Sequence, residues 1–220
     1  MANNNNKICV YDYETGGTNP LTTPILSIGA VIVEPTDLKI IDEFYSLSQP
    51  DEKGFAKIQD GALAVNNLTR EEIKKAVPEK IVWKDFTTFI GKHKKGTSNW
   101  NNCIESGFNI TGFDSIITER MCKLYGPYDK KEGRSKLFRP FPKIDAAQII
   151  FSWFENETEP FKLGLTSIAE HLGIDTTKAH NSLEDSRMTA QILIKFLKFQ
   201  RNIMEQYREK IKGCFLPKEE

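Results

Sequence analysis

Residues 7–17 read KICVYDYETGG, and this stretch predicts a strand that ends in a pair of acids. Its apolar residues Ile8 and Val10 alternate with other side chains, as is typical of a β-strand. Asp12 and Glu14 lie two residues apart, so both carboxylates project from the same face of that strand. Like charges held this close repel, and a hard divalent cation such as Mg²⁺ or Mn²⁺ between them would offset the repulsion. Taken alone, the stretch fits a hairpin with two solvated turn acids equally well.

The composition predicts one soluble globular domain, because the 220 residues are 39% hydrophobic and 27% charged. Lys and Arg number 30, as do Asp and Glu, so binding of nucleic acid by bulk charge is not expected, although a local basic groove is compatible with this balance. The four cysteines form no C-x-x-C pair, which favours a reduced, cytoplasmic protein without structural zinc. No apolar run approaches the ~20 residues of a membrane span, and no secretory signal opens the chain, so no membrane partner is expected.

The order of apolar and polar segments predicts an α/β domain that begins with a three-stranded meander. Its strands are expected at residues 7–17, 25–33 and 39–47, and a weaker strand pattern covers residues 103–109. Helices are expected at residues 59–75 (in fragments), 81–93, 113–125, 144–154 (after a strand end), 164–172 and 183–211. Thr69 and Glu72 form a capping box within the first of these ranges, and Leu124 is expected among the inward residues of the third. We expect a disordered tail at 1–6, the domain at 7–200 and a charged helical extension at 201–220.

Two later acids, Asp114 and Asp185, stand near predicted helix starts, where either alone is explained by the helix dipole at ~0.3–1 kcal/mol. His180 precedes Asp185 by five residues, and a lone histidine is most often a surface or core residue. Its unperturbed pKa of ~6.5 also suits a general base. Together, the four carboxylates could hold two divalent cations about 3.5–4 Å apart. One would activate a water that His180 deprotonates for in-line attack on phosphorus, and the other would stabilise the leaving 3′-oxygen.

Three motifs stand in order: VYDYET at 10–15, GFNITGFD at 107–114 and AHNSLED at 179–185. With them, the chain is identified as similar to the DEDDh 3′–5′ exonuclease superfamily from about residue 7 to residue 198. It most resembles the nuclease domain of bacterial exonuclease I, through DYETGGTNP at 12–20, ALAVNNLT at 62–69 and the spacing of Asn109 and Asp114. The resemblance implies a DnaQ-like, ribonuclease H-like fold, a mixed five-stranded sheet with helices on both faces. It assigns Asp12, Glu14, Asp114 and Asp185 as ligands of two Mg²⁺ or Mn²⁺ ions and His180 as the general base.

The same resemblance implies which residues contact the substrate. These are the backbone at Thr15 and Gly16, the side chains of Asn67 and Leu68, and Phe108 and Asn109 of the second motif. The basic segment at 130–143 is interpreted as an arm that contacts phosphates, with Phe138 and Phe141 able to stack on bases. The chain departs from exonuclease I by ending shortly after the nuclease domain, which argues against high processivity, and by having glycine at position 17, where relatives often have an aromatic residue.

The expected activity is metal-dependent 3′–5′ exonuclease action that releases nucleoside 5′-monophosphates. The expected partner is nucleic acid with a free 3′ end, with single-stranded DNA as the expected substrate, and a polymerase or a replication or repair protein could also bind. One alternative is an exoribonuclease like ribonuclease T or oligoribonuclease, because sugar selection depends on contacts to one hydroxyl. Another is a polymerase-associated proofreading exonuclease. A non-catalytic binding module is disfavoured, because all four acids and His180 are present.

Overall fold

A mixed six-stranded sheet forms the centre of the part of the chain that the structure, a computed structural model, describes: residues 6–154, 162–177, 179 and 181–215. Its strand order is β4-β3-β2-β1-β5-β8. The strands are β1 (Ile8–Thr15), β2 (Ile25–Glu34), β3 (Lys39–Gln49), β4 (Val77–Pro78), β5 (Ile104–Gly107) and β8 (Ile144–Asp145). The three long strands are antiparallel neighbours, and β5 and β8 add in parallel beyond β1. The five predicted strands are therefore present, and the short β4 extends the sheet beside β3.

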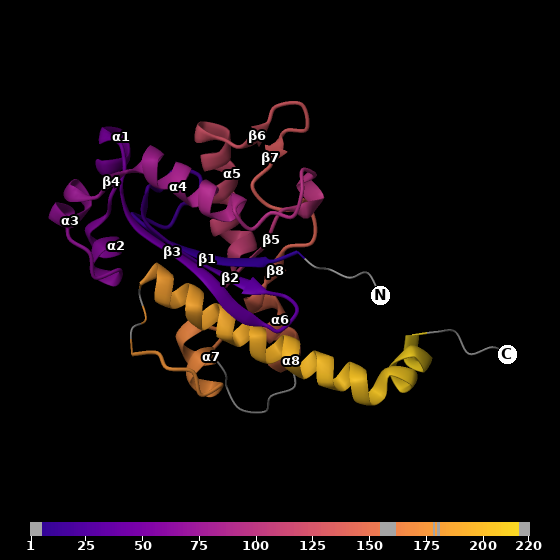
Figure 1. Cartoon of the computed structure of the whole chain (residues 1–220). Coiled ribbons are helices and arrows are strands. Elements are labelled where there is room, and N and C mark those ends of the chain that lie inside the picture. The colour runs from indigo at the N-terminus through magenta and orange to yellow at the C-terminus, as the bar shows by residue number, and fades with distance from the viewer. Residues whose placement is uncertain (1–5, 155–161, 178, 180, 216–220) are drawn as a thin grey trace.

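Helices cover both faces of the sheet, as predicted (Figure 1). On one face lie α4 (Glu79–Gly91) and α5 (Asp114–Tyr125); on the other lie α6 (Ala146–Phe154), α7 (Leu165–His171) and α8 (Ser182–Phe215). Three short helices, α1 (Glu52–Phe55), α2 (Asp60–Val65) and α3 (Arg70–Lys75), follow β3, and the 3-10 turns η1 (Asn99–Asn101) and η2 (Ile110–Gly112) flank β5. The predicted capping box at Thr69 and Glu72 opens α3. The helices packed on both faces of the sheet thus fix the position of its central strands.

Side chains of the central strand β1 pack into a different hydrophobic core on each face of the sheet. Tyr11 and Tyr13 pack into the cluster formed with α4 and α5, whereas Ile8 and Val10 pack into the cluster formed with α8. Because side chains alternate along a strand, Asp12 and Glu14 follow Ile8 and Val10 onto the α8 face. The neighbouring β2 is buried from Ile25 to Val33, which explains why its sequence lacks polar alternation. The acids of β1 therefore extend from a rigid, fully packed part of the sheet.

Three details of the predicted elements need correction. The basic segment expected as a loop contains a hairpin of β6 (Tyr128–Asp129) and β7 (Arg134–Ser135). Leu124 is 63% exposed, because Tyr125 packs against the core in the last turn of α5 instead. Phe138, interpreted as a base-stacking residue, is buried and stacks on Tyr11 with ring centroids 5.4 Å apart.

The last helix, α8, starts within one residue of its predicted beginning and runs to Phe215, with a non-helical backbone at Tyr207. Its second half extends past the sheet (Figure 1). In the described ranges, no helix combines the length and the apolar character that a membrane crossing requires.

Candidate active site

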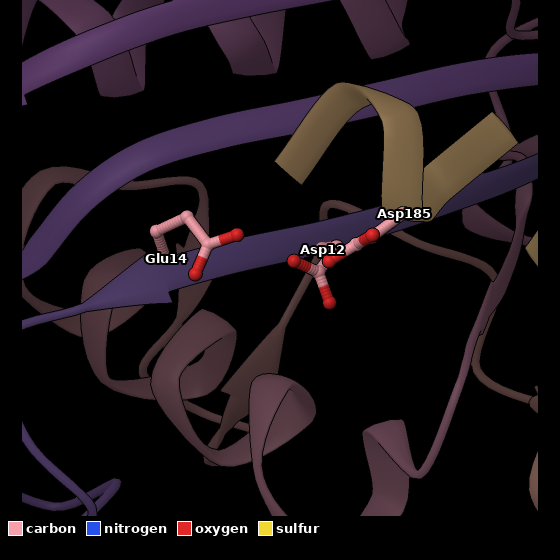
Figure 2. A group of neighbouring side chains, drawn as sticks. All are labelled: Asp12, Glu14 and Asp185. Carbon is pink, nitrogen blue, oxygen red and sulfur yellow. The ribbon is translucent and has the colours of Figure 1, made fainter. Parts of the chain in front are cut away.

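Three carboxylates converge where β1 passes under the first turn of α8. Asp12 and Glu14 come from β1, and Asp185 reaches down from α8 (Figure 2). One carboxylate oxygen from each lies within 4.8 Å of the others. Oxygen atoms alone at this spacing are the donor set that Mg²⁺ and Mn²⁺ prefer. The predicted grouping of these three acids is therefore present in the fold, and their chemistry fits a hard divalent cation.

A glycine on β2 lets α8 approach the sheet closely enough to deliver Asp185. Gly29 is the partner of Asp12 in the β1–β2 ladder. A Cβ built on Gly29 would lie 2.1 Å from the backbone carbon of Ser182, at the start of α8. Ser186 Oγ donates a hydrogen bond to the Gly29 carbonyl at 3.0 Å, and this bond fixes the helix on the strand. Sequence reasoning missed this role, although an isolated glycine in a strand often marks the close approach of another backbone.

Asp114 lies beside the three acids rather than within their cluster. It is the first residue of α5 and is 5% exposed. The backbone N–H of Tyr13 donates to Asp114 Oδ1 at 3.3 Å, so this side chain is attached to the same strand as Asp12 and Glu14. Burial raises the pKa of Asp114 to about 8, although this hydrogen bond acts in the opposite direction. A fourth carboxylate is thus available next to the cluster, on the α5 side of β1.

The electrostatics of the site favour binding of positive charge. Burial raises the pKa of Asp12 well above its usual value, and the charges of Asp114, Glu14 and Asp185 raise it further. Burial, with help from Asp185, raises the pKa of Glu14 to about 7. Shifts of this direction mean that the ionised acids destabilise one another at neutral pH. A bound cation would relieve that repulsion.

Behind the acids, a buried hydrogen-bond network connects β1 to α5 and β5. The hydroxyls of Tyr11 and Tyr13 lie 2.9 Å and 2.8 Å from Thr118 Oγ1. Tyr11 also donates to Glu105 Oε1 at 2.7 Å, and Lys143 Nζ lies 2.9 Å from the other oxygen of that carboxylate. Because Tyr11 and Tyr13 alternate with the site acids, the network fixes the strand that carries them. Glu105 was not recognised from the sequence, since its partners come from distant segments.

A second unrecognised acid, Asp145, organises the loop of the second motif. Its carboxylate is 5% exposed and accepts hydrogen bonds from the backbone N–H groups of Asn109 at 2.9 Å and Thr111 at 3.1 Å. The Thr111 hydroxyl adds a third bond at 2.8 Å. Asn109 has a left-handed backbone with φ of 56°, which asparagine tolerates better than most residues. Asp145 therefore fixes the turn that leads into Asp114.

The arrangement of the acids agrees with the protein family that the sequence of the whole chain matches. The family whose sequence profile matches residues 9–193 bears the description Exonuclease. The chain belongs to the exonuclease family. A DNA polymerase III PolC-type protein of Thermotoga petrophila is 27% identical to it over 196 residues, which cover 88% of this chain and 12% of that protein. The exonuclease domain thus spans only a small part of such relatives.

Solved structures show the same fold. Escherichia coli exonuclease I in complex with a dA16 oligonucleotide matches with a TM-score of 0.71 and 16% identity, over 91% of this chain and 42% of that chain. A 3′-exonuclease structure concerned with 3′-end specific recognition of a histone mRNA stem-loop matches with a TM-score of 0.64 and 18% identity, over 88% and 64% of the two chains. These structures confirm the predicted ribonuclease H-like fold, and the family match over residues 9–193 supports the predicted exonuclease superfamily.

The residues expected to contact substrate fall into two groups in the exonuclease domain. Near α2, the carbonyl of Thr15 accepts from Asn66 Nδ2 at 3.1 Å and that of Gly16 from the backbone of Gln59 at 2.9 Å. Asn67 and Leu68, the expected contacts there, follow directly; Asn67 is exposed, and Leu68 packs against a small apolar cluster.

The second group comes from the second motif, where Phe108 packs toward α6–α8 and Asn109 is exposed. His180 lies outside the described residues. Next to it, Asn181 Oδ1 accepts from the Leu183 backbone at 3.1 Å and caps α8. The assignment of His180 and of the substrate contacts remains a prediction.

The raised pKa values of Glu14 and Asp114 predict that the metal-free exonuclease domain loses thermal stability as the pH rises from about 4 to about 8. Below this window, both folded and unfolded chains hold the protons of Glu14 and Asp114. Within it, the unfolded chain releases them first, since unfolded acids titrate near 4. Stability is therefore retained at low pH and lost through the window. Melting curves in EDTA should show this fall, and Mn²⁺ should reverse it at the upper end. A melting temperature that is unchanged across this range in EDTA would contradict the predicted repulsion.

Proposed function

We propose that this exonuclease domain is a metal-dependent 3′–5′ exonuclease that removes nucleoside 5′-monophosphates from single-stranded DNA. The observation that carries the proposal is the convergence of Asp12, Glu14 and Asp185 within 4.8 Å of one another, with Asp114 beside them. These are the acids at the three motifs by which the chain resembles the DEDDh superfamily. Membership of the exonuclease family supports the same reaction class.

In the proposed reaction, the four carboxylates of Asp12, Glu14, Asp114 and Asp185 would hold two Mg²⁺ or Mn²⁺ ions. When bound, such ions lower the pKa of water and offset charge that develops on the phosphoryl group and the leaving oxygen. His180 accepts the proton of the attacking water, because a neutral imidazole is available near neutral pH. The hydrogen-bond networks of Glu105 and Asp145 keep β1 and the second motif in place around the reacting phosphate.

The proposed path of the terminal nucleotide lies between the two groups of predicted contacts. The backbone at Thr15 and Gly16 supports the sugar, and Asn67 and Leu68 separate the terminal base from its neighbour. Phe108 and Asn109 contact the nucleotide from the side of the second motif. The exposed positions of Asn67 and Asn109 support these roles, because both side chains are accessible to a ligand.

The test is incubation of the purified chain with single-stranded DNA labelled at its 5′ end, in Mg²⁺, Mn²⁺ or EDTA. A ladder of products shortened from the 3′ end, and absent in EDTA, is expected. DNA labelled at the 3′ end should release only labelled mononucleotide, because an endonuclease would release longer labelled fragments. A His180→Ala variant that binds Mn²⁺ normally but loses turnover would support the general base. Cleavage that persists in EDTA would disprove the metal-dependent mechanism.

Two specific observations favour other substrates of the same site. The PolC-type relative favours removal of mismatched 3′ nucleotides on behalf of a polymerase, and the structural likeness to a 3′-exonuclease of histone mRNA favours RNA. Parallel assays with a mismatched primer–template and with RNA of the same sequence distinguish them. Faster cleavage of RNA than of DNA would assign an exoribonuclease, and faster removal of mismatched than of paired ends would assign proofreading.

A further inference from the structure

A groove of about 550 Å³ crosses the outer surface of α5 and ends at the β6–β7 hairpin. Thr111 of the second motif and Leu21 of the turn after β1 line one part of it, and Tyr128 and Gly133 of the hairpin line another. Arg120 and Lys123 of α5 also contribute to the wall. Because Thr111 and Ser115 both line the groove, it begins at the end of α5 that carries Asp114.

The walls of this groove are held in place by contacts that sequence patterns did not reveal. Arg120 Nη2 donates to the carbonyl of Thr23 at 2.5 Å, which ties α5 to the turn that carries Leu21. Thr111 is fixed by Asp145, as described above. At the hairpin, Ser135 N donates to both oxygens of Glu119 on α5, at 3.0 Å and 3.1 Å. A long ligand could therefore lie along the groove without first ordering its walls.

Some basic side chains of this region form ion pairs with acidic residues, and others do not. Lys136 pairs with Asp129 at 2.5 Å, Arg134 with Glu132 at 2.6 Å and Lys143 with the buried Glu105 at 2.9 Å. These pairs neutralise much of the segment that was interpreted as a basic arm. Three exposed lysines form no ion pair with another described residue: Lys123 on α5, and Lys130 and Lys131 in the hairpin turn.

Groups other than these lysines also suit a nucleic acid strand. Leu21 in the groove wall is 67% exposed, so its side chain is accessible to a base. Tyr128 is half-buried in the groove wall, so its ring offers a surface to a base. Basic grooves that alternate with apolar or aromatic surfaces are typical of proteins that bind single strands without sequence preference.

We propose that this groove binds the single strand on the 5′ side of the nucleotide being removed. Lys123, Lys130 and Lys131 contact its phosphates, and Leu21 and Tyr128 contact its bases. The direction of the strand rests on the proposed function, since only a 3′ end at the acids places the 5′ portion along α5. The binding of the strand does not require cleavage. The strand path therefore runs over α5 and the hairpin turn, and not over the buried Phe138.

The test compares two variants of equal charge change. The groove variant, Lys123→Glu/Lys130→Glu, changes Lys123 in the groove wall and Lys130 in the hairpin turn at its end, and the control, Lys195→Glu/Lys198→Glu, changes the exposed side of α8. Anisotropy with a labelled oligothymidylate of about twelve nucleotides, in EDTA so that cleavage is suppressed, measures binding at several salt concentrations. We expect the groove variant to bind roughly tenfold more weakly, with a salt slope smaller by about 1.4, the value for two lost phosphate contacts. The α8 variant should bind like wild type, and a trinucleotide should bind equally to all three proteins.

Each outcome decides the proposal. Equal weakening by both variants, or none by either, would overturn it, as would tighter binding of a duplex than of the single strand. In Mg²⁺, the groove variant should have a higher KM for the long oligonucleotide than wild type and the same kcat. If the wild-type protein binds the long strand through the groove but cleaves nothing, the proposed function fails while the groove assignment stands. If it cleaves but the variants do not differ, the groove assignment alone fails.

Discussion

An Asp12→Asn variant is expected to lose turnover while melting at a higher temperature than wild type in metal-free buffer at about pH 8. The substitution keeps the shape of the side chain and removes the charge that Glu14, Asp114 and Asp185 repel. Loss of the stabilisation that a catalytic metal supplies, several kcal/mol, corresponds to roughly a 10³-fold lower kcat. Relief of the repulsion should raise the melting temperature by a few degrees, since about 1 kcal/mol shifts it by about 2–4 °C in a domain of this size.

Two measurements separate a metal ligand from a structural anchor at this position. The gain in melting temperature should shrink as the pH falls, because the raised pKa of Asp12 favours its uncharged form, which no longer repels its neighbours. Mn²⁺ should stabilise the wild type more than the variant, because the variant lacks one ligand. Asp85→Asn, an exposed change on α4, is the matched control and should alter neither property. A variant that melts below wild type in EDTA at the higher pH would show that Asp12 is structural.

The convergence of the acids could be predicted because it depends on short-range patterns. Alternation along a strand places Asp12 and Glu14 on one face, and that rule needs no tertiary information. Asp114 follows β5, which pairs in parallel with β1, so both strands deliver their acids to the same edge. Asp185 reaches the same point at the start of a long helix. These patterns therefore predicted that the acids converge, although they did not show that Asp114 stands apart from the closest three acids.

The supporting contacts could not be predicted, because each one joins segments that are distant in the sequence. Glu105 is buried only because Tyr11 and Lys143 come to it from other elements. Phe138 was assigned to the surface by its basic neighbours, yet its ring stacks on Tyr11 in the core. Likewise, charge counting could not show that Lys136 is paired while Lys130 is not. Local patterns identify chemistry, whereas the choice of partners requires the fold.

Gly29→Ala is expected to disrupt both stability and activity, although the added group is a single methyl far from any acid in sequence. The new Cβ would meet the backbone of Ser182 and Leu183 at 2.1 to 2.2 Å. Backbone atoms cannot rotate away as a side chain can, so α8 must move off the sheet or β2 must bend. Overpacking of this kind costs about 1–3 kcal/mol and occasionally more, which corresponds to a melting temperature lower by roughly 2–12 °C.

The movement required of α8 also links this glycine to the active site. Asp185 lies in the first turn of that helix, and misplacement of a reacting group by about 1 Å can cost 10²-fold in rate. The variant should therefore bind Mn²⁺ more weakly in titration calorimetry and turn over at least ~10²-fold more slowly even at temperatures where it is folded. Gly91→Ala is the matched control, because a Cβ there meets nothing within 4 Å and alanine favours the end of α4. Normal metal affinity in folded Gly29→Ala would show that the placement of Asp185 does not depend on this contact, and close packing of α8 on β2 would then serve stability alone.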